Sequence, residues 1–256
     1  MERERREEVF ERIKLGIPLL DELLPKGVFR RSLILLAGDS GVGKSFVAGL
    51  LAWSFARRGE KVIYVSLDDD PLTIISGLEL KGYDAWSLVD SKKILFVDGY
   101  GARYGVEPEE FVSEAIRELE PWGLLAALRR LVDQSGLECS GLLVIDSINP
   151  LLEKYEASNV FDFVNAVRAS IVKKKGVVTV MTLHTATQLY TEIAASLEYV
   201  VDVLVWMQHM EAAIEQGYPV KQLLVKKARG VPAIASWTPY MITDEGIVGV
   251  KVKKAS

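Results

Sequence analysis

Eight consecutive residues near the start of the chain have the types and spacing of a phosphate-binding loop. They fit the pattern G-x-x-x-x-G-K-[ST] and read Gly38-Asp39-Ser40-Gly41-Val42-Gly43-Lys44-Ser45. The glycines let the backbone curl so that successive N–H groups face an anion. We therefore expect Lys44 to reach the β- and γ-phosphates of a nucleoside triphosphate, and the Ser45 hydroxyl to ligate Mg²⁺. The residues expected to contact the nucleotide are Asp39, Ser40, Gly41, Val42, Gly43, Lys44, Ser45 and Phe46.

Carboxylates that would complete a Mg²⁺ site follow three apolar segments. A phosphate-bound Mg²⁺ needs an acidic partner at the end of a neighbouring buried strand. Asp68, Asp98 and Asp146 each stand in such a position, and periodicity alone does not choose among them. Asp146 follows the longest apolar stretch, precedes Ser147 and is the predicted metal residue. Asp98, which leads into a glycine-rich turn, is the alternative.

Asp68, Asp69 and Asp70 form an acidic run directly before Pro71. Like charges this close repel one another, so the run needs a cation or a helix start as compensation. One interpretation is structural, with the run and Pro71 beginning a helix over 72–80. The other is catalytic, with Asp68 or Asp69 polarising the water that attacks the γ-phosphate. Both can hold for different members of the run.

Alternating apolar and amphipathic segments must position these residues. Strand-like runs cover 33–37, 61–67, 94–97, 142–145, 177–183 and 201–207. Helix candidates follow the phosphate-binding loop, with Gly59 as a stop, and cover 108–119, 124–135 and 159–174. This alternation predicts an α/β fold in which helices cover both faces of a mostly parallel sheet. Short runs at 220–226, 234–239 and 241–252 predict antiparallel edge strands near the C-terminus.

Length, composition and charge limit the classes of function. We expect the 256 residues to form a single domain, with a charged helix over 1–12, and the 49% hydrophobic content allows a substantial core. No apolar run approaches the length of a membrane span. The net charge of −4 argues against a nucleic-acid partner, because no global basic field would attract one. Cys139 is the one cysteine, which excludes an internal disulfide; with no secretory signal at the N-terminus, the cytoplasm is favoured.

Several blocks in the chain resemble the KaiC-like ATPases of the RecA/RadA superfamily, especially the single-domain KaiC-like proteins of archaea. The entry segment at 15–24 is similar to the family's TGIPGLDELL, and the phosphate-binding loop follows it. Residues 64–69 are similar to an apolar strand that ends in two glutamates, and 142–147 to the Walker B strand. Residues 225–230 are similar to a K-x-R-G signature near the C-terminal end. The blocks occur in the family's order and span about 15–250.

This resemblance implies a RecA-like P-loop core that assembles into a homo-oligomeric, usually hexameric ring with ATP between neighbours. It implies that Lys44 and Ser45 hold phosphates and Mg²⁺, and that Asp146 is the Walker B aspartate. It also implies that Lys227 and Arg229 reach the γ-phosphate bound by the adjacent subunit; without it, both would be read as an exposed strand end. His184 lies where superfamily members often place a polar γ-phosphate sensor, although a plain strand-end histidine is the simpler reading.

Two departures from the family pattern bear on turnover. Asp68 and Asp69 replace the paired glutamates, and Asp is shorter by one methylene. A carboxylate withdrawn by about 1.5 Å polarises the attacking water poorly, and angstrom-scale misplacement costs about a hundredfold in rate. We therefore expect slow hydrolysis. The second departure, Pro25-Lys26-Gly27 in place of a glycine-rich turn, changes the loop after the entry segment.

The sequence thus predicts a slow ATPase whose oligomeric state reports the bound nucleotide to an unidentified protein partner. The first alternative is a scaffold that holds ATP without hydrolysing it, which the two aspartates motivate. The second is a RadA-like DNA recombination ATPase. The chain shows no helix-hairpin-helix segment or basic DNA-binding stretch, which argues against this second alternative.

Overall fold

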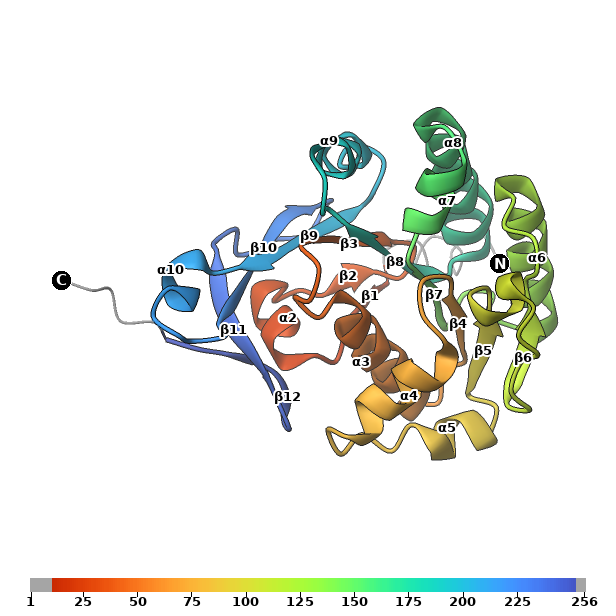
Figure 1. Cartoon of the computed structure of the whole chain (residues 1–256), viewed down its shortest axis with the longest axis horizontal. Helices are drawn as coiled ribbons and strands as arrows, with labels where there is room; N and C mark the ends of the chain where they lie inside the picture. Colours follow the sequence, from red (N-terminus) through yellow and green to blue (C-terminus); the bar gives the residue numbers. More distant parts are fainter. Residues whose placement is uncertain (1–10, 252–256) are drawn as a thin grey trace.

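A sheet of ten strands lies at the centre of the computed structural model, which describes residues 11–251 (Figure 1). Seven strands are mutually parallel: β3 (Leu33–Gly38), β4 (Val62–Ser66), β5 (Ile94–Asp98), β6 (Val112–Ala115), β7 (Leu142–Asp146), β8 (Val178–His184) and β9 (Val203–His209). Three antiparallel strands extend the sheet beside β9: β10 (Lys221–Ala228), β11 (Thr238–Thr243) and β12 (Gly246–Gly249). The order across the sheet is β12-β11-β10-β9-β3-β8-β7-β4-β5-β6.

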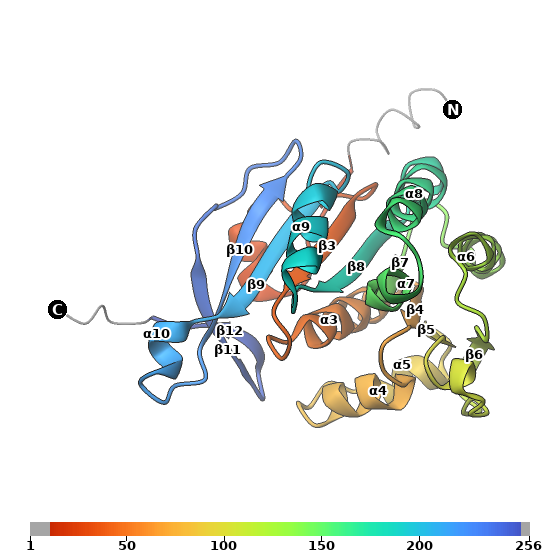
Figure 2. The same ribbon diagram turned by 45° about the horizontal axis from the view of Figure 1, so that its top comes forward.

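Helices cover both faces of the sheet (Figures 1 and 2). One face carries α2 (Pro18–Leu23), α3 (Lys44–Arg57), α4 (Pro71–Glu79) and α5 (Trp86–Asp90). The other carries α6 (Pro121–Ser135), α7 (Asn149–Lys154), α8 (Ala157–Val167) with its π-helical continuation η2 (Arg168–Lys173), and α9 (Gln188–Leu197). The remaining elements are η1 (Gly101–Tyr104), α10 (Glu211–Ile214) and a two-stranded sheet of β1 (Arg12–Ile13) and β2 (Val28–Phe29).

Alternation along each strand divides the apolar side chains between two cores. On β3, Ile34 and Leu36 face the core under α3, whereas Leu35 and Ala37 face the core under α8. Strands buried on both sides need continuous apolar sequence, which is why these segments are hydrophobic throughout. The predicted α/β fold, with a mostly parallel sheet and antiparallel strands near the C-terminus, is confirmed.

One predicted helix is wrong. Within 108–119 the chain instead forms β6, which pairs in parallel with β5 at the edge of the sheet. Val112, Ile116 and Leu119 have helical spacing, but Ile116 and Leu119 are buried from extended or irregular backbone. The backbone of β6 pairs with β5 across the edge of the sheet. This long-range pairing outweighs the helical spacing of the local sequence.

The predicted strands of the C-terminal region need correction at two places. The predicted N-terminal helix lies almost wholly outside the described residues. Residues 234–237 are not a strand, because the Ile234 N–H donates to the Leu23 carbonyl in α2 at 2.9 Å. The run 241–252 is interrupted by a turn at Asp244 and Glu245, after which Gly246 begins β12 with a φ of +100°, so that β11 and β12 form a hairpin. The charged helix expected over 1–12 falls almost wholly on residues 1–10, and Arg12 belongs to β1.

Candidate functional site

The carboxyl ends of the parallel strands bring the predicted site residues to one edge of the sheet. Gly38 at the end of β3 pairs with His184 at the end of β8. Ser66 at the end of β4 pairs with Asp146 on β7 and with Asp98 on β5. In open α/β sheets, ligands bind in the crevice outside these strand ends. Segments distant in sequence therefore meet where the phosphate-binding loop begins.

The loop between β3 and α3 has a backbone that only glycine allows at two positions. Gly38 has a φ of +152°, and a Cβ there would lie 1.7 Å from the Met207 carbonyl oxygen. Gly43 has a φ of +94°, and its Cβ would lie 2.3 Å from Cδ1 of Ile242. Gly43 is also the N-cap of α3 and provides no side-chain hydrogen bond. The first N–H groups of α3 are thus left to bind an anion.

Side chains from β9 and β11 fix the loop from outside. The His209 N–H donates to Asp39 Oδ2 at 3.1 Å, and the His209 ring nitrogen Nε2 lies 2.9 Å from the Ser40 carbonyl. The Tyr240 hydroxyl donates to the Val42 carbonyl at 2.7 Å. The end of β9 and the antiparallel strand β11 therefore hold the loop, in addition to β3 and α3 on either side of it.

Lys44 is almost fully buried and lies inside the loop. It is 2% exposed, and its Nζ donates to the carbonyls of Gly38 at 2.9 Å and Asp39 at 2.6 Å. Burial lowers the pKa of Lys44 to about 8, although the charges of Asp146, Asp39 and Asp68 oppose the shift. An anion bound in the loop would compete with these carbonyls for the ammonium and favour its charged form.

Asp146 is held next to Ser45 by a set of hydroxyl groups. Ser45 Oγ donates to Asp146 Oδ1 at 3.2 Å, and Thr182 Oγ1 donates to the same oxygen. The Tyr64 hydroxyl donates to Asp146 Oδ2 at 2.6 Å, and burial raises the pKa of Tyr64 well above its usual value. Asp98 has a different role, since its carboxylate accepts the N–H groups of residues 100–102. The geometry therefore favours Asp146 over Asp98 beside the loop.

Ser45 and Asp146 fit the protein side of a Mg²⁺ site. Two adjacent ligands of an octahedral Mg²⁺, each about 2.1 Å from the ion, lie about 3 Å apart. The 3.2 Å separation of Ser45 Oγ and Asp146 Oδ1 matches this spacing. Within residues 11–251, no three His, Cys, Asp or Glu side chains cluster as metal ligands. The remaining ligands would therefore be phosphate oxygens and water, as is usual for Mg²⁺.

Asp68 is oriented toward this edge by two residues from neighbouring strands. Its Oδ2 accepts a hydrogen bond from Ser147 Oγ at 3.1 Å and lies 3.2 Å from His184 Nε2. The contact with His184 lowers the pKa of Asp68. His184 is in turn fixed by Asn149, which bonds its backbone N–H at 2.7 Å and its carbonyl at 3.0 Å. His184 is thus more than a plain strand end, because its ring contacts a candidate catalytic carboxylate.

The three aspartates of the acidic run do different things. Asp70 is the N-cap of α4 and accepts the N–H groups of Leu72 at 2.6 Å and Thr73 at 3.1 Å. Asp69 is exposed, and its Oδ1 accepts the N–H of Asp70. The Ser66 hydroxyl at the end of β4 donates to the Asp69 backbone carbonyl, but of the three carboxylates only that of Asp68 contacts strand-end side chains among the described residues. The structural interpretation therefore holds for Asp70, while the geometry favours Asp68 over Asp69 for contact with the site.

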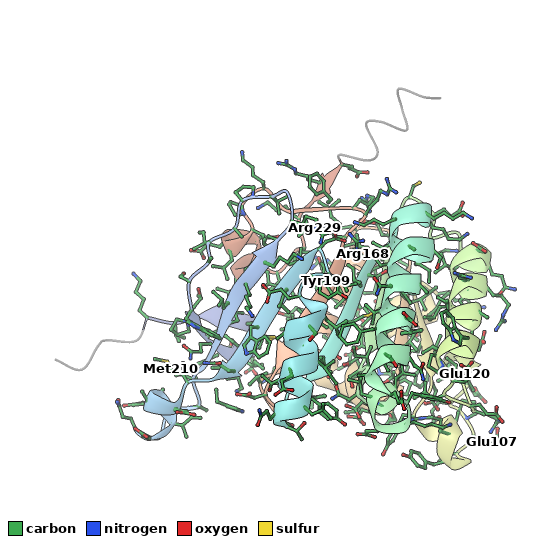
Figure 3. The ribbon with its side chains drawn as sticks, turned by 90° about the horizontal axis from the view of Figure 1, so that it is seen from above. Glu107, Glu120, Arg168, Tyr199, Met210 and Arg229 are labelled. Carbon is green, nitrogen blue, oxygen red and sulfur yellow. The ribbon has the colours of Figure 1, made fainter. Side chains whose placement is uncertain are left out.

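Lys227 and Arg229 lie away from the phosphate-binding loop of their own chain. Lys227 pairs with Leu204 near the start of β9, whereas Gly38 pairs with Met207 toward the end of that strand. Figure 3 shows Arg229 and Met210 at opposite ends of the β9–β10 pair. Lys227 Nζ donates to the Glu198 carbonyl, and Arg229 bonds the Tyr199 carbonyl at 2.9 Å and Asp202 at 3.3 Å. The structure does not bring these two cations to their own site.

Five contact residues of the site were not anticipated from the sequence: Tyr64, Asn149, Thr182, His209 and Tyr240. Tyr64, Thr182 and Tyr240 lie within apolar strand segments. A hydroxyl group among hydrophobic residues was the feature of the sequence that could have indicated a role for them. Buried hydroxyl groups require partners, so each of these positions predicts a polar neighbour without identifying it. Asn149 lies two residues after the predicted Walker B segment at 142–147, and this position was the other available signal.

Comparisons with known proteins place the chain among KaiC-like proteins. The family model described as "ATPase: KaiC" matches residues 13–254. A UPF0273 protein of Thermotoga maritima is 27% identical over 94% of this chain and 96% of its own length. The circadian clock protein KaiC2 of Synechocystis is 32% identical, over 43% of this chain and 20% of its own.

A solved structure gives the same assignment for the fold. The crystal structure of a KaiC-like protein from the archaeon Pyrococcus horikoshii superposes with a TM-score of 0.73. The match covers 94% of this chain and all of the other, at 22% identity. Separately, none of the helices within residues 11–251 has the length and apolar character of a membrane span.

Proposed function

The chain belongs to the KaiC family of ATPases, and on this premise we propose that it is a slow, oligomeric ATPase whose nucleotide state is read by a protein partner. The family supports ATP binding and ATPase activity. One observation carries the proposal: Lys44, Ser45, Asp146 and Asp68 meet at one edge of the sheet although they come from three segments of the chain. We further propose that the whole chain acts as one domain.

The residues at this edge divide the work of phosphoryl transfer among them. The amides of the loop and Lys44 hold the phosphates, and Ser45 and Asp146 hold Mg²⁺, which neutralises charge on the phosphate oxygens when bound. Asp68 orients the attacking water, because it is the exposed carboxylate that Ser147 and His184 direct toward the strand ends. Phosphoryl transfer depends mainly on positioning and charge, so the placement of Asp68 determines the rate.

A second subunit supplies the cations missing from the site. Lys227 and Arg229 lie at the far end of the sheet from the loop of their own chain, which supports a role at a neighbour's nucleotide. A cation supplied in trans stabilises the charge that spreads over the transferring phosphoryl group. In this arrangement a closed, hexameric ring contains one nucleotide at each contact between subunits.

Single-turnover hydrolysis of ATP·Mg²⁺ tests the proposal, together with analysis of nucleotide that remains bound after purification. We expect a rate below about 1 per second, which is the low end of typical turnover, and loss of ATP binding in Lys44→Ala. A faster rate would overturn the proposal that ATP hydrolysis is slow. Retained ATP without phosphate release would favour a non-hydrolysing scaffold instead.

A further inference from the structure

Arg103 reaches from η1 to the backbone beside Asp68. The η1 turn follows β5, the strand that pairs with β4. Nη2 of Arg103 donates to the Leu67 carbonyl at 2.6 Å. Leu67 directly precedes Asp68, so this carbonyl belongs to the peptide unit that joins the two residues. The contact therefore acts on the backbone that carries the candidate catalytic carboxylate.

Both peptide groups of Leu67 are bonded, and to different neighbours. The Leu67 N–H donates to the Asp146 carbonyl on β7 at 2.6 Å. The Leu67 carbonyl has Arg103 as its one hydrogen-bond donor among the described residues. Leu67 is fully buried, so solvent does not supply another partner. The position of Asp68 relative to Asp146 therefore depends on the arginine.

Asp98 fixes the segment that carries Arg103. Its carboxylate accepts the N–H groups of residues 100–102 at 2.8, 2.9 and 3.1 Å. The turn also lies directly against Leu67, because a Cβ at Gly99 would be 2.5 Å from Cδ2 of that leucine. Asp98, which does not lie beside the phosphate-binding loop, thus sets the place from which Arg103 extends.

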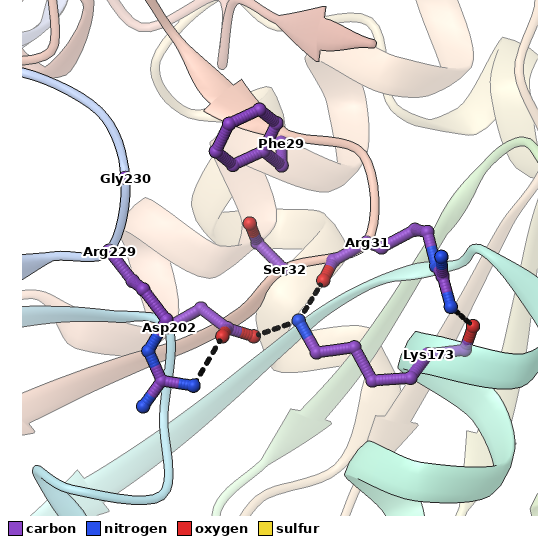
Figure 4. A pocket seen from close by; sticks show the side chains of 7 residues that line it. All are labelled: Phe29, Arg31, Ser32, Lys173, Asp202, Arg229 and Gly230. Carbon is purple, nitrogen blue, oxygen red and sulfur yellow. Dashed lines mark hydrogen bonds and ion pairs between the residues drawn. The ribbon is translucent and has the colours of Figure 1, made fainter. Parts of the chain in front are cut away.

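The Arg103 guanidinium is not held by a carboxylate of the part of the chain that the structure describes. Arg229 differs, since it bonds Asp202 at 3.3 Å (Figure 4). Nε of Arg103 is buried and has no hydrogen-bond partner among residues 11–251. A buried donor without a partner lowers stability, so folding alone does not account for this arginine. Its charge also acts on the site: the hydrogen bond with His184 lowers the pKa of Asp68 most, and Arg103 adds to the effect.

We propose that Arg103 is a positioning residue for ATP hydrolysis, which holds the Leu67 carbonyl so that Asp68 faces the attacking water. This inference rests on the proposed function, because it needs Asp68 to orient that water. Arg103 acts through Asp68 and not on the phosphates, so its loss should slow hydrolysis without weakening ATP binding. Displacement of a reacting group by about 1 Å is enough to cost a large part of the rate.

Single-turnover hydrolysis and ATP titration of Arg103 variants test this role. Arg103→Met removes the hydrogen bond and the charge, and should slow hydrolysis by about tenfold while affinity for ATP·Mg²⁺ stays within about twofold. Arg103→Lys keeps a charge and a donor, and because the arginine makes a single hydrogen bond, its rate should stay within about threefold of the wild type. Arg117→Met is the matched control. Arg117 is exposed and pairs with Glu107 at 3.2 Å, so its loss should change neither quantity.

The Asp68→Asn background shows whether Arg103 acts through Asp68. Asp68→Asn alone should slow hydrolysis, and adding Arg103→Met should then slow it by less than about twofold more, since residues that act as a unit are not additive. A further tenfold loss, or weaker ATP binding in Arg103→Met alone, would indicate direct contact with the phosphates and overturn the proposal. If Arg103→Met does not fold, Arg103→Gln, which is neutral but keeps a donor, takes its place with the same expectations.

Two further outcomes separate this inference from the proposed function. If Asp68→Asn is slow but Arg103→Met hydrolyses ATP at the wild-type rate, Arg103 does not position Asp68, and the role of Asp68 stands. If Asp68→Asn itself hydrolyses ATP at the wild-type rate, the proposed role of Asp68 is wrong, and the inference about Arg103 is wrong with it.

Discussion

At the scale of single residues, we propose that the length of the Asp68 side chain limits the rate of ATP hydrolysis. Asp68 already contacts Ser147 and His184, so its direction is set by the strands around it. What it lacks is reach, because glutamate would extend its carboxylate by one methylene. Asp69 differs in having its side chain bonded to the neighbouring Asp70 N–H, outside this network.

We expect Asp68→Glu to raise the single-turnover rate of ATP hydrolysis by about tenfold, because an added reach of about 1.5 Å moves the carboxylate toward the attacking water. Asp69→Glu is the matched control and should change the rate by less than about twofold, a shift typical of a group outside the reaction. Quenched-flow measurement of phosphate release separates these cases. A slower Asp68→Glu enzyme, or an equal gain in both variants, would contradict the role of Asp68.

The charge of Lys44 predicts how ATP binding responds to pH. Burial lowers its pKa to about 8, so the ammonium of the free protein loses its proton above that pH. Phosphates favour the charged form, so binding above that pH must take up a proton. Affinity for ATP·Mg²⁺ should be constant below about pH 7 and fall above about pH 8 by up to tenfold per pH unit.

Calorimetry in two buffers of different ionisation heat measures this proton uptake directly. At about pH 8.5 it should reach about three quarters of a proton per ATP bound, which is the deprotonated fraction of a group whose pKa is about 8. Lys44→Arg is the control, because a guanidinium stays charged across this range and its affinity should not depend on pH. If the affinity of the wild-type chain for ATP·Mg²⁺ does not depend on pH, Lys44 stays protonated across this range.

At the scale of elements, the antiparallel strands act as a support for the phosphate-binding loop. The Tyr240 hydroxyl on β11 is the one side-chain donor to the Val42 carbonyl among the described residues. Tyr240→Phe leaves that buried carbonyl without a partner, which should lower the free energy of unfolding by about 1–2 kcal/mol. Affinity for ATP should fall severalfold as well, because the loop loses its outer support. Denaturant unfolding and ATP titration measure the two effects.

Tyr218→Phe is the matched control for this variant. Tyr218 is 62% exposed, and among the described residues its hydroxyl has no hydrogen-bond partner. The free energy of unfolding should change by less than about 0.5 kcal/mol, as for most surface substitutions. If Tyr240→Phe binds ATP as tightly as this control does, the hairpin of β11 and β12 contributes only stability.

Sequence patterns predict the elements of this chain well wherever a segment is buried on both sides. Strands such as β3 and β7 are recognisable because both faces demand apolar residues. The edge strand β6 is not, since it is only partly buried and its few apolar residues happen to fit a helix. In the site, the loop and Asp146 follow from motif and position. The contacts of Tyr64 and Tyr240 depend on which strands become neighbours, and a local pattern does not contain that information.

At the scale of the whole molecule, the proposed site is divided between two chains. The loop lies at one end of the sheet, and Arg229 at the other, where Asp202 and the Tyr199 carbonyl hold it. One chain alone therefore lacks Arg229 at its own nucleotide, where Lys44 is its own cation. Native mass measurement should show a larger assembly in the presence of ATP·Mg²⁺, since the nucleotide would join neighbouring subunits.

Mixing two inactive variants tests this division directly. Lys44→Ala lacks a functional loop but retains Arg229, and Arg229→Ala has the opposite defect. In a mixed ring, a loop from the second variant can face Arg229 from the first. With equal amounts and random assembly, about a quarter of the contacts between subunits are of this kind, so about a quarter of wild-type hydrolysis should return. Replacing the first variant by Lys44→Ala/Arg229→Ala should abolish this recovery. Native mass measurement checks that both variants enter the same ring. If such mixed rings remain inactive, Arg229 does not act on a neighbour's ATP.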